Sequence, residues 1–187
     1  MKQFENPWTV LGSRQIYQNN WIGLTEFDVI NPNGGPGIYG KIHYKNIAVG
    51  VLPLDDALNT YLVGQYRFPL DQYSWEIPEG GGDPLVEPLE SAKRELLEET
   101  GLEAKDWTLL LQLHLSNSVS DELAILYLAR QLTQHTPMPE ETEKLSIKKL
   151  PFEEVYRMMQ QGSITDAMSV AVILQVKLML LDGRISS

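Results

Sequence analysis

The 187-residue sequence has no cysteine and little positive charge relative to its negative charge. Without cysteine the chain forms no disulfide and performs no thiol chemistry, which is consistent with a reducing compartment. Its 25 aspartates and glutamates outnumber its 15 lysines and arginines, giving a formal net charge of −10. Excess negative charge disfavours broad binding to the phosphate backbone of DNA or RNA. We therefore expect no nucleic-acid partner.

Long apolar segments are also absent from the sequence. The longest apolar run, residues 167–181, contains Gln175 and Lys177 and is shorter than the roughly 20 residues that span a bilayer. The first residues, MKQFENP, contain no apolar signal segment. We therefore predict no membrane partner and a cytoplasmic protein. The 43% of hydrophobic residues suffice for the core of one ordinary domain.

The most informative stretch is residues 80–102, GGGDPLVEPLESAKRELLEETGL. Three glycines form a predicted loop that leads into a predicted helix, and Gly101 suits the left-handed position just after the helix. Glu95, Glu98 and Glu99 follow i, i+3, i+4 spacing, so their carboxylates share one helix face. Like charges at this spacing destabilise a helix by roughly 0.2–0.5 kcal/mol per pair. The pattern indicates either a bound cation that offsets the repulsion or an ordinary solvated acidic face.

The second half of this stretch resembles the Nudix box of the Nudix hydrolases. That box ends in Arg-Glu-aliphatic-any-Glu-Glu-any-Gly-aliphatic, and residues 94–102 (RELLEETGL) match it at every position. The first half departs from the box, because the position of its first glutamate falls on Val86 and the nearest glutamate is Glu87. One residue is therefore missing before Pro88. We expect Glu87 to cap the helix, where its charge suits the positive helix start.

Other segments are similar to the ADP-ribose pyrophosphatase-like branch of these hydrolases. They are residues 13–17 (SRQIY) with Trp21 beyond them, residues 65–67 (QYR), residues 75–78 (WEIP) and residues 116–122 (SNSVSDE). The last segment departs from the branch, which usually has proline and glycine where this chain has Asn117 and Ser118. The resemblance implies hydrolysis of a nucleoside diphosphate sugar, with ADP-ribose giving AMP and ribose 5-phosphate.

The same resemblance assigns roles to the acidic residues of the box. Glu95 and Glu99 are the predicted direct ligands of Mg²⁺, or of Mn²⁺, because hard cations take oxygen ligands. Glu98 is predicted as a ligand, directly or through water, and as a catalytic residue that Arg94 holds. The backbone carbonyl of Gly80, or of the residue before it, completes the predicted metal site.

The candidate general base is Glu122, which lies in the segment that resembles the catalytic loop of the branch. The alternative is a merely solvated residue in a polar loop. Trp21 is a candidate for binding the substrate. For Trp21 and Tyr39 we also consider a place in the core or at an interface, which the sequence favours slightly.

Two charged residues before the box are candidates for binding the substrate. Arg67 is predicted to contact phosphate oxygens, because a guanidinium group matches them with two parallel hydrogen bonds. Its alternative is a surface ion pair with Asp71. Glu76 lies in an apolar strand, where an unpaired charge is rare. It either serves the substrate site or pairs with Arg67 or Arg94.

Two other functions remain open at this point. One is a diphosphatase for another nucleoside diphosphate sugar or a dinucleoside polyphosphate. The other is a non-catalytic ligand sensor on the same fold. Such sensors often lose acids of the box or carry an added DNA-binding domain. This chain keeps Glu95, Glu98 and Glu99 and has no added basic domain, which favours an enzyme.

The order of apolar segments predicts an α/β fold. The expected strands are residues 21–30, 38–44, 47–54, 61–67, 107–115, 123–132 and 144–150, and residues 74–77 lead into the glycine loop. Besides the box helix, helices are expected at residues 151–161 and from a cap at Asp166 to near Gly183. With helices on both faces of a mixed sheet, this is the Nudix-type α/β/α sandwich that the resemblance implies.

The N-terminal region is predicted to be a separate small subdomain. Residues 1–45 would form a β-hairpin on the dimerisation and substrate side, and residues 46–187 would form the hydrolase domain. The N-terminal region contains several aromatic residues, more than a two-stranded hairpin buries alone: Trp8, Tyr17, Trp21, Phe27 and Tyr39. Because aromatic residues are enriched at interfaces, we predict a homodimer that forms partly through this hairpin.

Overall fold

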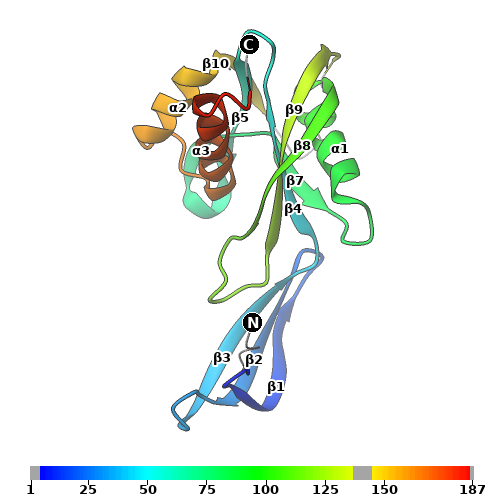
Figure 1. The fold of residues 1–187 in the computed structure, drawn as a ribbon. Helices are drawn as coiled ribbons and strands as arrows, with labels where there is room; N and C mark the ends of the chain where they lie inside the picture. The colour runs from blue at the N-terminus through cyan, green and yellow to red at the C-terminus, as the bar shows by residue number, and fades with distance from the viewer. Residues whose placement is uncertain (1–4, 137–144, 186–187) are drawn as a thin grey trace. The chain divides into compact units, whose positions relative to one another are not determined.

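The computed structural model describes residues 5–136 and 145–185 and divides into two compact units (Figure 1). The N-terminal unit contains Met1–Asn46 and Ser116–Glu122, and the larger unit contains Ile47–Leu115 and Leu123–Ser187. Among the described residues, no helix has both the length and the apolar character to cross a membrane.

The N-terminal unit is a three-stranded antiparallel sheet in the order β1-β2-β3. Its strands are β1 (Thr9–Gln18), β2 (Ile22–Ile30) and β3 (Pro36–Tyr44). The predicted hairpin is present as β2 and β3, and the turn between them is stabilised by Asn31, whose Oδ1 accepts from the backbone N–H groups of Asn33 and Gly35 at 2.9 and 3.2 Å. Strand β1 was not predicted. Its pairing with β2 shifts register twice, and such bulges break the two-residue alternation that signals a strand.

In the described part of the larger unit there are two sheets and three α-helices. One sheet has the order β7-β4-β9-β8, with β4 parallel to β9 and the other neighbours antiparallel. Its strands are β4 (Ile47–Pro53), β7 (Glu79–Gly82), β8 (Leu102–His114) and β9 (Leu123–Gln134). The other sheet is antiparallel in the order β10-β5-β6, with β5 (Asn59–Arg67), β6 (Gln72–Glu76) and β10 (Ser146–Pro151). A short 3-10 helix, Phe68–Leu70, joins β5 to β6.

The helices cover both faces of the four-stranded sheet (Figure 1). Helix α1 (Pro88–Thr100) packs on one face, where Val49, Val51 and alternate residues of β9 share a buried cluster with Ala92 and Leu96. The intervening residues of β4 and β9 point to the other face and pack with α2 (Phe152–Gln160) and α3 (Ala167–Leu181). The predicted α/β/α sandwich with a mixed sheet is therefore confirmed.

Several element boundaries differ from the sequence prediction. The glycine run is not a loop, because residues 79–82 form strand β7 and pair with β4. Strand β8 starts at Leu102, directly after Gly101, whose φ of 71° reverses the chain at the end of α1. The strand expected to start at Lys144 is observed from Ser146, and Lys144 itself lies outside the described residues.

Candidate functional site

The acidic face of helix α1 is turned toward the protein and not toward solvent. Glu95 and Glu99 are buried, with exposed fractions of 9% and 2%. The side chain of Glu98 retains 30% exposure. Burial of a carboxylate is costly unless positive charge or hydrogen bonds meet it. Glu95 and Glu99 therefore do not belong to an ordinary solvated helix face.

Arg94 connects the acids of the helix to the glycine strand. Its guanidinium lies 2.7 Å from an Oε of Glu98 and 2.6 Å from an Oε of Glu95. The same group donates to the carbonyl oxygen of Gly81 at 2.8 Å. The predicted pairing of Arg94 with Glu98 is thus present, and the arginine also neutralises part of the charge of Glu95.

Strand β7 lies against this acidic face because three of its four residues are glycine. A Cβ at Gly80 would collide with the carboxylate of Glu95, so only glycine allows this close approach. One residue earlier, the backbone N–H of Glu79 donates to Oε2 of Glu99 at 2.9 Å. The glycine strand therefore forms a cradle for the carboxylates of both buried acids, and the predicted carbonyl ligand at Gly80 lies in that strand.

A second charged cluster adjoins the glycine strand. Arg67 Nε donates to both carboxylate oxygens of Glu76 at 3.0 Å, and its Nη2 lies 3.1 Å from Oε1 of Glu79. Glu76 is almost completely buried, and Arg67 is one-third exposed. Asp71 instead accepts from the hydroxyl of Tyr66 at 2.5 Å. The surface pair of Arg67 with Asp71 is therefore wrong, and the pairing of Glu76 with Arg67 is present.

Glu79 is a buried acid whose side chain the sequence reasoning missed. Burial, together with the negative charges of Asp166 and Glu76, raises the pKa of Glu79 well above its usual value. The nearby guanidinium of Arg67 acts in the opposite direction but does not outweigh these effects. The Oε2 atom of Glu79 is buried and has no hydrogen-bond partner within residues 5–136 and 145–185. Asp166, predicted only as a helix cap, does cap α3 by accepting from Ser169 N–H at 2.7 Å.

These residues fit a divalent cation in the chemistry of their donor atoms. Four carboxylates occupy poorly solvated positions along β6, β7 and α1, those of Glu76, Glu79, Glu95 and Glu99. The guanidinium groups of Arg67 and Arg94 lie against the first three of them. Carboxylate and carbonyl oxygens are the ligands that hard cations prefer. Within the described residues, no three acidic, histidine or cysteine side chains are already arranged as a set of metal ligands. Arg94 instead bridges Glu95 and Glu98.

We expect Glu79→Gln to raise the melting temperature of the metal-free protein at pH 8. A carboxyl with a raised pKa favours the protonated folded state, so its contribution to stability is lost as pH rises from the unfolded toward the folded pKa. Glutamine stays neutral and avoids that loss. A gain of ~1 kcal/mol would raise the melting temperature by about 2–4 °C in a chain of this size. Calorimetry with a chelator at pH 5 and pH 8 measures the difference, which should grow with pH.

The control for this change is Glu90→Gln on the exposed surface of α1, where only a surface pair with Lys93 is lost. A lower melting temperature for Glu79→Gln at pH 8 would show that ionised Glu79 stabilises the fold through Arg67.

Helix α1 starts after Glu87 and stops before Gly101, as the sequence predicted. Glu87 is the N-cap, Pro88 begins the helix, and the backbone of Gly101 closes it with φ of 71°. The Glu87 side chain makes no capping hydrogen bond. Its effect at the cap is therefore that of charge near the positive helix start.

Two candidate residues, Glu122 and Trp21, belong to the N-terminal unit. Glu122 ends the loop Ser116–Glu122, and its charge contributes, after burial, to raising the pKa of Tyr44. Trp21 lies in the turn between β1 and β2 with 66% of its surface exposed, so it is not a core residue. Tyr39 packs edge-on against Trp8 with ring centroids 5.2 Å apart.

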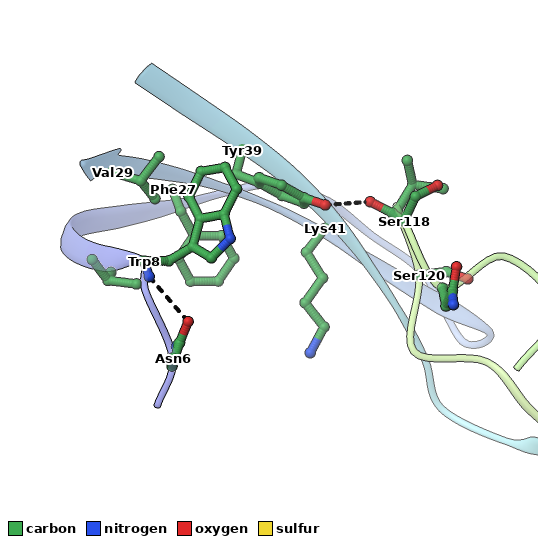
Figure 2. A pocket seen from close by; sticks show the side chains of 11 residues that line it. Asn6, Trp8, Phe27, Val29, Tyr39, Lys41, Ser118 and Ser120 are labelled. Atoms are coloured by element: carbon green, nitrogen blue, oxygen red, sulfur yellow. Dashed lines mark hydrogen bonds between the residues drawn. The ribbon is translucent and has the colours of Figure 1, made fainter. Parts of the chain in front are cut away.

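Tyr39 also helps to line a cavity of about 340 Å³ within the N-terminal unit (Figure 2). The cavity is lined by Phe27 and Lys41 of the sheet, by Trp8 just before β1, and by residues 117–120 of the loop. This cavity could not be predicted from the sequence, because it depends on contacts between segments almost 80 residues apart, such as Tyr39 and Ser118. At the edge of the cavity, the hydroxyl of Tyr39 donates to the carbonyl oxygen of Ser118 at 2.5 Å.

Comparison with known proteins covers nearly the whole chain. The NUDIX domain model matches residues 44–168, and the model described as nucleoside diphosphate sugar hydrolase N-terminal domain matches residues 8–42. An ADP-ribose pyrophosphatase of Mycobacterium tuberculosis is 30% identical over 92% of this chain and 84% of its own length. An ADP-ribose pyrophosphatase of Bacillus subtilis is 29% identical over 95% of this chain and 96% of its own.

The solved structures agree with the fold. A crystal structure of an ADP compounds hydrolase superimposes with a TM-score of 0.85 at 22% identity, covering 98% of this chain and all of the other. At that identity the likeness establishes the shared fold alone.

Proposed function

Because this chain belongs to the NUDIX family, we propose that it hydrolyses the diphosphate linkage of a nucleoside diphosphate sugar with the help of a divalent cation. The observation that carries this proposal is the burial of Glu95 and Glu99 against the glycine strand β7. Buried carboxylates need positive charge beside them. A hard cation that also binds phosphate oxygens supplies such charge.

We propose ADP-ribose as the substrate and AMP with ribose 5-phosphate as the products. The oxygen of water bonds to one phosphorus, the bridging P–O bond breaks, and two phosphate monoesters are released. Two relatives named ADP-ribose pyrophosphatase, which align over more than nine-tenths of the chain, support this choice. Asn117 and Ser118 depart from the proline and glycine of that branch. Another nucleoside diphosphate sugar or a dinucleoside polyphosphate is therefore the alternative substrate.

The proposed cation is Mg²⁺, with Mn²⁺ as the alternative. Glu95 and Glu99 would hold it directly, Glu98 directly or through water, and the carbonyl of Gly80 would complete the set. When bound, such an ion neutralises the diphosphate charge and lowers the pKa of water. Arg94 would keep Glu98 oriented through the ion pair that it already makes at 2.7 Å.

The remaining candidates would bind the substrate and move the proton. Arg67 would contact phosphate oxygens with the exposed third of its side chain, while Glu76 fixes the guanidinium by its two-oxygen contact. Trp21 would stack on the nucleobase of the substrate, because its exposed ring offers a flat apolar surface. Glu122 would take the proton from the attacking water.

A screen of nucleoside diphosphate compounds with Mg²⁺ and with Mn²⁺, reading released phosphate monoesters, tests the proposed function. We expect AMP from ADP-ribose, and no AMP in the presence of a chelator. Cleavage of a different compound would change the substrate and leave the reaction class intact. Binding of ADP-ribose without any hydrolysis would favour the non-catalytic ligand sensor.

We also propose a homodimer that forms through the N-terminal sheet. That sheet leaves several large apolar side chains exposed: Val10, Leu11, Ile16, Tyr17, Trp21 and Ile38. Exposed apolar patches of this kind mark interaction surfaces. Sedimentation at micromolar protein should give twice the chain mass of 21.2 kDa.

The variant Ile38→Glu, which places a charge on β3 where Ile38 is 68% exposed, should sediment at the single-chain mass. Its matched control is Leu181→Glu, at an equally exposed position at the end of α3 in the other unit, which should remain a dimer. A wild-type mass near 21.2 kDa would rule out the dimer.

A further inference from the structure

The loop Ser116–Glu122, which carries the candidate base, is bound along one strand of the N-terminal sheet. Ile42 of β3 donates its backbone N–H to the carbonyl of Val119 at 2.8 Å, and its own carbonyl accepts from Asp121 N–H at 3.2 Å. Strand β3 is at the edge of its sheet, so its outer backbone groups are available for such pairing. The loop thus extends the sheet by a short stretch of backbone pairing.

The carboxylate of Asp121 adds three side-chain contacts to the same strand. Its Oδ1 accepts from the backbone N–H of Tyr44 at 3.0 Å. Its Oδ2 lies 2.8 Å from Nζ of Lys41 and 2.9 Å from Nδ1 of His43. Partial burial alone would raise the pKa of Asp121, but these donors outweigh it and hold the pKa well below its usual range. Asp121 is therefore a charged clamp directly beside Glu122.

Below the loop there is open space and not packed core. Residues 117–120 line the cavity of about 340 Å³ together with the aromatic side chains of Trp8, Phe27 and Tyr39 (Figure 2). Only the bond from the Tyr39 hydroxyl to the carbonyl of Ser118 crosses its edge among the interactions drawn there. The place of the loop therefore depends on its polar contacts with β3 more than on apolar packing.

We propose that Asp121 is a positioning residue that fixes the base-carrying loop on β3 and thereby restrains the adjacent Glu122. The inference rests on the proposed function, which gives Glu122 its role. Misplacement of a reacting group by about 1 Å costs on the order of 10²-fold in rate. Loss of the clamp should therefore lower kcat while leaving substrate affinity largely intact.

The test compares Asp121→Ala with Glu122→Gln and with the double variant. We expect Asp121→Ala to lower kcat by about 10- to 100-fold with little change in KM. In the Glu122→Gln background it should lower kcat no further, since residues that act as a unit are not additive. Hydrogen exchange of the amides in residues 116–122 should become faster. Asp121→Asn, which keeps the shape and loses the charge, should show an intermediate effect and covers the case in which alanine prevents folding.

The matched control is Glu26→Gln, which removes the Arg14–Glu26 pair of 2.7 Å from the same sheet and should leave kcat unchanged. If the wild type is active and Glu122→Gln is not, an unchanged kcat in Asp121→Ala overturns the positioning role of Asp121 and leaves the proposed function intact. A further loss in the double variant also overturns it. If the wild type hydrolyses no substrate, the proposed function fails, and unchanged exchange in residues 116–122 would overturn the clamp as well.

Discussion

Glu99→Gln is expected to lower turnover by about 10³-fold or more while the protein stays folded. The change removes a ligand charge from the predicted cation site, where metal stabilisation of the transition state is worth several kcal/mol. A loss of ~4 kcal/mol corresponds to roughly 10³ in rate. The fold should survive, because the remaining amide oxygen of glutamine can still accept the hydrogen bond from Glu79 N–H that Glu99 accepts at 2.9 Å.

Steady-state kinetics with Mg²⁺, circular dichroism and calorimetric titration of the cation measure this effect. The titration should show weaker cation binding even where no substrate is present. Glu90→Gln is the control, because Glu90 lies on the exposed side of the same helix and pairs only with Lys93 at 2.7 Å. Near wild-type activity in a folded Glu99→Gln protein would show that the assignment of Glu99 to the metal is wrong.

The helix of the site was readable from the sequence because its determinants are local. Glu95, Glu98 and Glu99 share a face through helical spacing alone, and Gly101 ends the helix by adopting a conformation that other residues avoid. Strands β4 and β9 were likewise expected, at residues 47–54 and 123–132, because their apolar segments are local features of the sequence. Such local patterns predict an element and the residues that share one of its faces, even when the segments that pack against it are unknown.

The parts that escaped prediction depend on contacts between distant segments. The pKa of Glu79 is raised first by burial and then by the charge of Asp166, and both depend on segments that lie far apart along the chain. The glycine run was predicted to be a loop, but the absence of side chains on its glycines lets β7 pair with β4 and still approach Glu95. Asp121 is an unremarkable loop residue until β3 supplies its three donors.

Glu122→Gln is expected to reduce the rate by about 10²–10⁴, the usual range for a positioned general acid or base, with little change in KM. Glutamine keeps the size of the side chain and cannot accept the proton of the attacking water. Steady-state kinetics of the wild type and the variant with Mg²⁺ measure kcat and KM, and circular dichroism shows that the variant is folded.

Glu103→Gln is the control for this experiment, since it removes a glutamate whose partner in the structure, His135, lies at 3.0 Å on the exposed surface. A reduction below about threefold for Glu122→Gln would leave Glu122 as a solvated loop residue, because a working base contributes at least 10²-fold. The base would then be sought at Glu98, which keeps 30% of its side chain exposed beside the predicted cation site. Glu76 is the weaker candidate, since its buried carboxylate already accepts both hydrogen bonds that Arg67 Nε donates.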